Sequence, residues 1–351
     1  MANGCSRALK TDDMKVYENY SLLHHNTFGI DARCRRFIEY ETADELHEAL
    51  AVLREHPDEP FLHIGAGSNL LFTRDFPGTI LHSAIRGVDM AGGNADTVLL
   101  RVGAGEVWDD FVARCVSRHL YGIENLSLIP GEVGAAAVQN IGAYGEEVEK
   151  FIDCVETIEV ASGKARVFTH DECRYGYRSS FFKGEGHGRY VVTHVVFRLS
   201  CRFAPVLSYG ALQKEMERRG MHNPTAEELR RLVVDIRRAK LPDPSERGNA
   251  GSFFVNPVVS EEKYRELAAR YPDMPHYAMP GGVKIPAGWM IEQCGWKGRP
   301  LGRTGVHDRQ ALVLVNLGGA TGSDVVALSD AIRSDVRDRF GIDLHPEVNF
   351  I

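Results

Sequence analysis

The chain has 351 residues, of which 44% are hydrophobic and 25% charged, which is typical of a soluble globular protein with two or three domains. Its formal net charge of −7, with acidic and basic residues interspersed, excludes the basic stripe that binds a nucleic-acid backbone. No apolar run reaches the roughly 18 residues of a spanning helix, so we expect no membrane partner.

The N-terminal residues, MANGCSRALKTDDMK, show no periodicity and lack the apolar core of a secretion signal. We assign residues 1–20 to an N-terminal extension that can be disordered. The seven cysteines lie far apart without a C-x-x-C motif, which favours reduced thiols over a disulfide framework or a zinc site. These features predict a cytoplasmic protein without a bound metal.

A helix and a strand are predicted next. Thr42 and Glu45 have the spacing of a capping box, and the leucines behind them predict a helix over 43–55. The apolar run Phe61–Ile64 predicts a strand. It ends in a turn of small residues, which are Gly65, Ala66, Gly67, Ser68 and Asn69. Such a turn leaves backbone N–H groups able to contact a phosphate.

A second segment of small residues, PGEVGAAAVQNIGAYGEE (130–147), contains glycines and alanines but no Lys or Arg. Glycine concentrates where the backbone needs a positive φ or a close approach. The segment fits either an anion-binding loop or tight packing of a helix on a sheet, and the similar turn upstream favours the anion. Between the two, Gly103–Gly105 precedes the acidic Glu106 and is interpreted as a structural turn. A helical stripe from Trp108 to Val116 is assigned to the core.

Strands dominate from Ile152 to Arg198, and helices and strands do not alternate strictly, which favours an α+β fold. The strands stop near 201–205, where we place a domain boundary. Beyond it, a capping box at Thr225 and Glu228 opens a helix. Its predicted inner face is Leu229, Leu232, Val233 and Ile236. Further helices are predicted near 261–271 and 287–294, a strand at 312–317, and a last helix ending at Gly341.

Eight sequence segments follow one another from Asn26 to the C-terminus. They are NTFGI (26–30), IGAGSNLLF (64–72), IPGEVGAAAVQNIGAYG (129–145), YGYRSSFFK (175–183), KLPDP (240–244), GNAGSFFVNP (248–257), AGWMIEQCGWKG (287–298) and HPEVNF (345–350). Any one alone is weak evidence. In this order they resemble the UDP-N-acetylenolpyruvoylglucosamine reductases, the type I MurB flavoenzymes of peptidoglycan precursor synthesis.

The resemblance implies a two-part FAD-binding domain of the vanillyl-alcohol oxidase type, with subdomains at 21–90 and 91–205. An α+β substrate-binding domain would follow over 206–351. It further implies non-covalent FAD, NADPH as co-substrate, and reduction of the enolpyruvyl UDP-sugar to UDP-N-acetylmuramate. We expect a monomer whose partners are small molecules.

Three side chains match family residues that act in catalysis. Arg178, in YGYRSS, would bind the enolpyruvyl carboxylate beside the flavin and stabilise an enolate. Ser252, in GNAGSFF, would donate a proton to carbon, and Glu347, in HPEVNF, would assist protonation. Read alone, these residues are an ion-pairing arginine, a loop serine and a strand-edge charge.

The implied FAD contacts lie in the two Gly-rich segments and at Arg178. In addition to residues 65–69, they are Pro130, Gly131, Gly134, Ala135, Gln139, Asn140, Ile141, Gly142, Ala143, Tyr144 and Gly145. The implied substrate-binding residues are Tyr209, Lys240, Asn256 and Gln293. Tyr209, in PVLSYG, belongs to the type I form of the family, whose mobile loop closes over the nucleotide.

The sequence departs from the family pattern at two positions. Ala137 replaces a proline that is often found there. Glu132 stands where small or hydroxylated residues are common, and a carboxylate aimed at a pyrophosphate would repel it. We therefore expect Glu132 to face away.

Two other functions stay open at this point. An oxidase or dehydrogenase of the same FAD fold would often carry covalent FAD and would lack a GNAGSFF-type segment. A non-catalytic sugar-nucleotide binder would have lost one of Arg178, Ser252 or Glu347. All three are present, which favours the reductase.

Overall fold

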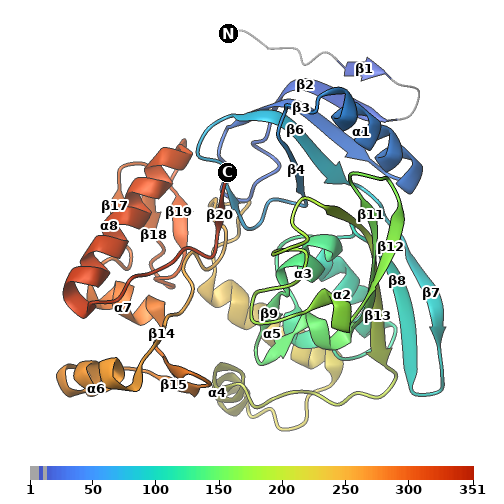
Figure 1. The fold of residues 1–351 in the computed structure, drawn as a ribbon. Helices are drawn as coiled ribbons and strands as arrows, with labels where there is room; N and C mark the ends of the chain where they lie inside the picture. Colours follow the sequence, from blue (N-terminus) through green and yellow to red (C-terminus); the bar gives the residue numbers. More distant parts are fainter. Residues whose placement is uncertain (1–7, 11–13) are drawn as a thin grey trace. The chain divides into compact units, whose positions relative to one another are not determined.

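The computed structural model describes residues 8–10 and 14–351, which fold into two compact units (Figure 1). The first unit consists of Cys34–Ala66, Pro77–Ala239 and the described N-terminal residues up to Tyr20. Ser21–Arg33, Gly67–Phe76 and Lys240–Ile351 form the second. Helices and strands are mixed along the chain, and the predicted α+β class is confirmed.

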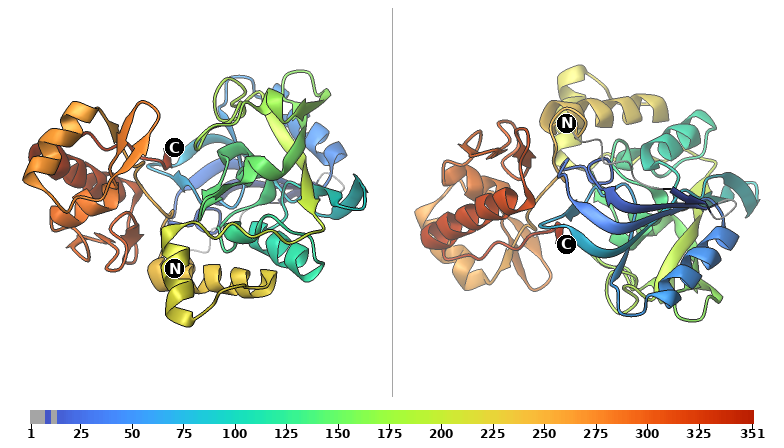
Figure 2. Two further views of the ribbon diagram at one scale, coloured as in Figure 1. Left: turned by 90° about the horizontal axis from the view of Figure 1, so that it is seen from below. Right: turned by 90° about the horizontal axis from the view of Figure 1, so that it is seen from above.

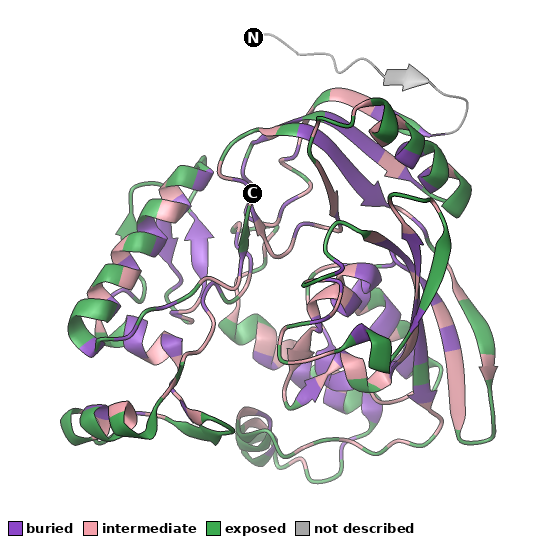
Figure 3. Ribbon diagram, viewed as in Figure 1, coloured by how far each residue is buried: buried purple, intermediate pink, exposed green. Residues whose placement is uncertain are grey.

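The first unit contains a five-stranded sheet with the order β1-β2-β3-β6-β4. Its strands are β1 (Ala8–Lys10), β2 (Lys15–Ser21), β3 (Arg33–Tyr40), β4 (Phe61–Ile64) and β6 (Phe76–Ser83). The predicted helix is α1 (Ala43–Glu55), which lies along this sheet (Figure 2). Its buried Leu46 and Leu50 belong to the same core as residues of the sheet. Its predicted cap is present, because the Glu45 N–H donates to Thr42 Oγ1 over 3.1 Å. In Figure 3, β6 is buried along most of its length, whereas α1 exposes its outer face.

Part of the predicted N-terminal extension is ordered. Residues 15–20 lie in β2, which is hydrogen-bonded between β1 and β3, so the prediction was wrong for them. Val16 and the preceding Met14 are buried in the core below α1, which explains why this segment joins the sheet. Residues 1–7 and 11–13 of the predicted extension lie outside the described residues.

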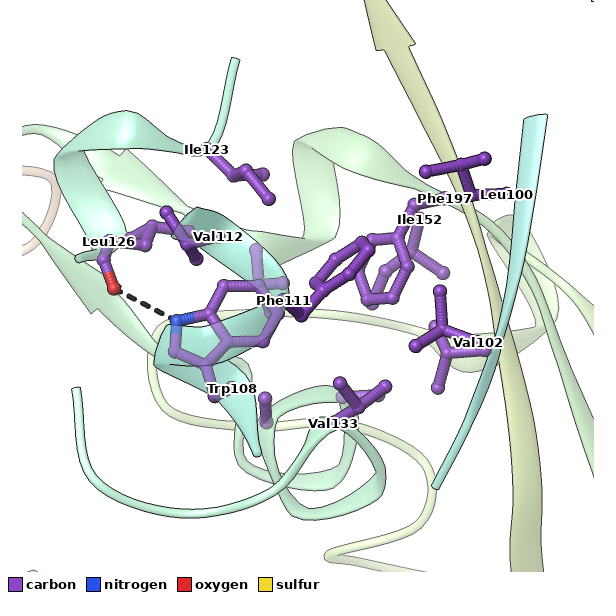
Figure 4. Packing of buried hydrophobic residues seen from close by; sticks show 14 of the residues in the cluster. Leu100, Val102, Trp108, Phe111, Val112, Ile123, Leu126, Val133, Ile152 and Phe197 are labelled. Carbon is purple, nitrogen blue, oxygen red and sulfur yellow. Dashed lines mark hydrogen bonds between the residues drawn. The ribbon is translucent and has the colours of Figure 1, made fainter. Parts of the chain in front are cut away.

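A second five-stranded sheet, with the order β12-β11-β13-β8-β7, completes the first unit. The strands are β7 (Val88–Gly93), β8 (Thr97–Gly103), β11 (Ile152–Glu159), β12 (Ala165–Thr169) and β13 (Tyr190–Ser200). Helices α2 (Trp108–Ser117) and α3 (Val133–Gln139) contribute to one core with this sheet, centred on Trp108, Phe111 and Phe197 (Figure 4). The Trp108 indole N–H donates to the Leu126 carbonyl over 2.8 Å. The predicted core role of the 108–116 stripe is confirmed.

The domain boundary lies at Lys240 rather than near 205, and this corrects our prediction. Helices α4 (Gly210–Arg219) and α5 (Ala226–Lys240) bury their apolar faces against one another and against Phe203. Arg230 of α5 also forms a two-pronged ion pair with Asp109 of α2, at 2.6 and 2.9 Å. The predicted subdomain 21–90 is also divided, since residues 21–33 and 67–76 belong to the second unit.

The second unit contains two three-stranded sheets and three helices. The sheets are β14 (Val258–Val259), β16 (Gly282–Lys284) and β15 (Tyr277–Met279), and β17 (Pro300–Leu301), β18 (Thr304–Val306) and β19 (Leu314–Asn316). The helices are α6 (Glu261–Arg270), α7 (Ala287–Gln293) and α8 (Gly322–Phe340). α8 stops at Gly341, whose φ of 64° fits a glycine C-cap, as predicted. β5 (Leu70–Leu71) pairs in parallel with β20 (Asn349–Phe350).

No helix of the described chain combines the length and apolar character needed to cross a membrane. The same residues contain no group of three or more His, Cys, Asp or Glu side chains that could hold a metal ion.

Candidate active site

The second Gly-rich segment begins with close packing of α3. Gly134 donates its N–H to the Ala104 carbonyl over 2.8 Å, and a Cβ on Gly134 would lie 2.8 Å from the Ala104 Cβ. A larger residue would push α3 away from the end of β8. At this position the glycine serves helix packing, which was the alternative that the sequence left open.

The segment then turns through a short hairpin with three positive φ angles. They are 48° at Asn140, 48° at Tyr144 and 87° at Gly145. Asn140 is fully buried, and its amide donates to Glu147 Oε2 and to the Gly176 carbonyl, both over 2.9 Å. The hairpin is thereby fixed to the YGYR segment that carries Arg178.

Arg178 lies against this hairpin. Its guanidinium donates to the Gly142 carbonyl over 2.7 Å and to the Asn140 carbonyl over 3.2 Å. A Cβ on Gly142 would lie 2.8 Å from Arg178 Nη1, so glycine is what permits this approach. Arg178 itself has a φ of 53°, and Lys183 Nζ donates to its carbonyl over 3.1 Å. The structure thus brings Arg178 together with the predicted FAD contacts at 140–145.

Tyr209 also reaches this hairpin. It is the N-cap residue of α4, and its half-exposed ring meets the Tyr144 ring edge-on with centroids 5.5 Å apart. Two nearby residues were missed by the sequence analysis. The buried Asn125 donates to the carbonyls of Tyr144 and Val206, both over 2.9 Å, and so joins the hairpin to the segment before Tyr209. Nothing in the local sequence around Asn125 signals this role.

Arg237 is the second residue that was missed. Its Nε donates to the Leu128 carbonyl over 3.1 Å, and burial lowers the pKa of its guanidinium. It lies on α5, which we had assigned to another domain. Arg237 could have been recognised as a half-buried cation beside the Gly-rich segment only if the boundary between the two units had been predicted correctly.

Glu132 precedes α3 as its N-cap residue but does not cap the helix with its side chain. Its buried carboxylate accepts from His82 Nε2 over 3.2 Å. Its other oxygen lies 2.9 Å from where a Gly65 Cβ would stand. Glu132 therefore points inward, toward His82 and the first Gly-rich turn, and its charge has a partner on β6.

In the second unit, the other predicted catalytic residues lie on hydrogen-bonded extended segments. Ser252 is exposed and is followed by the fully buried Phe253 and Phe254. The Glu347 N–H donates to the Phe253 carbonyl over 2.8 Å, so Ser252 and Glu347 are held on neighbouring segments. Asn69 donates its amide to the Glu347 carbonyl over 3.3 Å, which brings the first Gly-rich turn to the same place.

The NTFGI segment supports this turn. Gly67 has a φ of 66°, and a Cβ there would stand 2.1 Å from the His25 carbonyl oxygen. The Thr27 N–H donates to the Gly67 carbonyl over 3.3 Å, and the Asn249 N–H donates to the Thr27 carbonyl over 2.9 Å. Four of the eight segments that carry the resemblance therefore meet within the second unit.

The remaining predicted substrate residues are placed as follows. Asn256 Oδ1 accepts from the Ala287 N–H over 2.9 Å, at the start of α7. Gln293 is the exposed last residue of α7, and its carbonyl accepts from Arg339. Lys240 is exposed and is the last residue of α5.

One buried atom fits a ligand in the second Gly-rich segment. Gln139 Nε2 is buried and has no hydrogen-bond partner within the described chain. A buried donor without a partner costs about 1–3 kcal/mol, so native proteins usually satisfy it. The donor, the positive φ angles beside it and the nearby Arg178 suit an anionic cofactor such as FAD.

Comparison with known families agrees with this fit. Residues 35–170 match the family model described as "FAD binding domain". Residues 243–351 match the model described as "UDP-N-acetylenolpyruvoylglucosamine reductase, C-terminal domain". The fold and the Gly-rich segments thus define a flavin-binding oxidoreductase.

Related proteins and a solved structure narrow the class. A UDP-N-acetylenolpyruvoylglucosamine reductase of Bacteroides fragilis is 56% identical over 95% of this chain and 99% of its own. One from Porphyromonas gingivalis is 50% identical over 96% of this chain and 100% of its own. The crystal structure of the Thermus caldophilus reductase covers 96% of this chain and 99% of its own, at 25% identity and a TM-score of 0.67. The chain belongs to the UDP-N-acetylenolpyruvoylglucosamine reductase family.

Proposed function

We propose that the chain reduces UDP-N-acetylenolpyruvoylglucosamine to UDP-N-acetylmuramate for peptidoglycan precursor synthesis, with non-covalent FAD and NADPH. When bound, FAD would accept hydride from NADPH and deliver it to the terminal enolpyruvyl carbon. Relatives that bear the reductase name and that this chain covers almost completely support this reaction over an oxidase or a non-catalytic binder. The observation that carries the proposal is the anchored Arg178 guanidinium beside the Gly-rich hairpin.

Arg178 would bind the carboxylate of the enolpyruvyl group. A guanidinium can contact both carboxylate oxygens, and it would stabilise the negative charge that builds there as hydride arrives. Its anchoring to two backbone carbonyls and the exclusion of a side chain at Gly142 support this role, because a preorganised cation needs no rearrangement during the reaction.

Ser252 would give a proton to the carbon next to the carboxylate, which completes the addition of one hydride and one proton to the double bond. A serine hydroxyl is a poor acid and needs help from a neighbouring charge. Lys240, the last residue of α5, would supply a cationic field, and Glu347, held on the adjoining segment, would order the proton donor. The exposed Ser252 beside the buried Phe253 and Phe254 supports a hydroxyl that is fixed in place but accessible.

The remaining residues would bind the nucleotide ligands. Tyr209, Asn256 and Gln293 would contact the sugar and diphosphate of the substrate. The FAD would be held by the two Gly-rich segments, including Gln139 and the backbone of 140–145. The contact of Tyr209 with Tyr144 supports a place for the phenol near the second of these segments.

The test separates the two halves of the reaction in a stopped-flow instrument. Ser252→Ala should leave reduction of the flavin by NADPH near normal, because that step needs no proton at carbon. Reoxidation by the enolpyruvyl UDP-sugar should slow by roughly 10²–10⁴-fold, as for a lost general acid. Ser245→Ala is the matched control, since that hydroxyl in the same loop donates to Asp243. Equal slowing of both halves would refute the proton-donor role. Purified protein that is colourless and takes up no FAD would refute the function as a whole.

A further inference from the structure

A row of charged side chains, two of them buried, lies next to the first Gly-rich turn. His82 on β6 contacts two carboxylates, Glu39 Oε2 through Nδ1 and Glu132 Oε1 through Nε2, each over 3.2 Å. His82 and Glu132 are buried. On the solvent side, Glu39 Oε1 forms an ion pair with Lys15, whose Nζ lies 3.1 Å away. The row therefore links β2, β3, β6 and the start of the second Gly-rich segment.

The contacts fix the charge of His82. A carboxylate is only an acceptor when ionised, so both imidazole nitrogens must carry a proton to satisfy Glu39 and Glu132. Burial opposes the charged ring, but hydrogen bonds to Glu132 and Glu39 outweigh it and raise the pKa of His82 to about 9.

The other titratable groups around His82 leave this assignment intact. His63, on the neighbouring β4, is bonded to the Tyr40 hydroxyl over 2.7 Å, and burial lowers the pKa of His63 to about 3. His63 is therefore neutral, and burial raises the pKa of the Tyr40 phenol, which is neutral too. Lys15 is the cation at the outer end of the row. Lys15 also contacts Glu41 Oε1 over 2.8 Å, so the row holds three carboxylates and two cations.

This row touches both Gly-rich segments. Ile64, which immediately precedes Gly65, lies opposite His82 in the parallel pair of β4 and β6. Glu132 Oε2 lies within 2.9 Å of the Gly65 Cβ position, and the Cβ of Ala135 within 3.3 Å of it. Glu132 thus lies between the end of β4 and the start of α3, and its contact with the charged His82 holds it there.

We propose that His82 is a positioning residue for FAD: its imidazolium neutralises Glu132 and keeps that carboxylate against Gly65, so that an acidic residue can stand among backbone groups that bind an anion. The proposal rests on the FAD-binding assignment. If the ring loses its proton, the buried Glu132 and the partly exposed Glu39 become like-charged neighbours with no cation between them. They repel, the two Gly-rich segments separate, and FAD binds more weakly.

The experiment measures FAD dissociation constants of the apo-protein between pH 6 and pH 10. It compares the wild type with His82→Gln, Glu132→Gln and the double variant. Single replacement of His82 should weaken FAD binding by roughly 10- to 100-fold, the size expected when a hydrogen bond to a charged group is lost. The double variant should recover most of this loss, because it removes the charge that His82 compensates. His194→Gln, which changes a histidine of the other sheet, is the matched control and should bind FAD normally.

The pH dependence gives a readout that a purely structural role would not move. Wild-type affinity should fall as the pH rises through about 9, and Glu132→Gln should remove this fall even if His82→Gln does not fold. Excess FAD should restore turnover of His82→Gln, since the residue acts on cofactor binding. A flat wild-type profile, or losses that simply add in the double variant, would overturn the proposal alone. A wild type that binds no FAD at pH 7 would overturn the cofactor assignment with it.

Discussion

Gly142→Ala should slow reduction of the UDP-sugar because it displaces Arg178, which lies 36 positions later in the sequence. The added Cβ would lie 2.8 Å from Arg178 Nη1 and 2.9 Å from the Glu146 carbonyl oxygen, whereas ordinary contacts begin at 3.4 Å. The guanidinium therefore has to retreat by about 0.6 Å, and the backbone at Glu146 has to shift as well. That movement stretches the 3.2 Å bond to the Asn140 carbonyl beyond hydrogen-bond range. Losing a hydrogen bond of a charged donor costs about 1.5–3 kcal/mol, which corresponds to roughly 10- to 150-fold in rate or affinity.

The assay is single-turnover reoxidation of the reduced flavin by the UDP-sugar, with FAD at saturation. Gly142→Ala should slow it by the factor above, and Arg178→Lys should have an effect of similar size. The double variant should lose less than the sum of the two single losses, because both changes act on the same guanidinium contact. Gly184→Ala is the control, since its Cβ would meet only ordinary contacts of 3.6 Å or more. Additive losses in the double variant, or normal turnover of Gly142→Ala, would refute the described placement of Arg178.

Three further predictions concern substrate capture, the core and pH. Tyr209→Phe should raise the Michaelis constant for the UDP-sugar by roughly 10- to 150-fold through one lost hydrogen bond, with flavin reduction by NADPH unchanged; normal binding without turnover would place Tyr209 among the catalytic groups. Trp108→Phe leaves the buried Leu126 carbonyl without its donor and should lower the free energy of unfolding in urea by about 1–3 kcal/mol; an unchanged midpoint would contradict this. Because folding raises the pKa of His82 from 6.5 to about 9, its contribution to stability is complete below pH 6.5 and is lost as the pH rises through 9. The pKa of Glu39 falls from 4.5 to about 2 through its hydrogen bond to His82, so its contribution is present above pH 4.5 and is lost toward pH 2. Thermal melts across this range should show both declines, and a melting temperature that stays level on the alkaline side would be incompatible with a charged His82.

Local signals in the sequence predicted most helices of the fold but only a minority of its strands. The capping boxes at Thr42 and Thr225 mark helices that begin one residue later, at Ala43 and Ala226. The alternating, β-branched run before Arg198 is the long strand β13. These signals succeed because caps and apolar periodicity act within one or two turns of chain.

The division into units could not be predicted in the same way. The loss of strand pattern near 205 suggested a boundary there, but α5 is bound to the first unit by the ion pair between Arg230 and Asp109. These residues are 121 positions apart. An ion pair at that separation leaves no periodic trace in a single sequence. As a result, Arg237 on the same helix was overlooked.

Glu132 shows why the chemistry of a site can depart from a family pattern without loss of the site. From the sequence alone, an acidic residue in an anion-binding segment should repel the anion, and we expected the Glu132 side chain to point away from it. In the structure the Glu132 carboxylate is instead paired with His82, which lies 50 positions earlier in the sequence. A glycine at position 65 leaves room for this carboxylate, because a Cβ there would lie 2.9 Å from Glu132 Oε2. Three positions that look independent in the sequence, Gly65, His82 and Glu132, are therefore one physical unit, and a substitution at one of them changes what the other two can be.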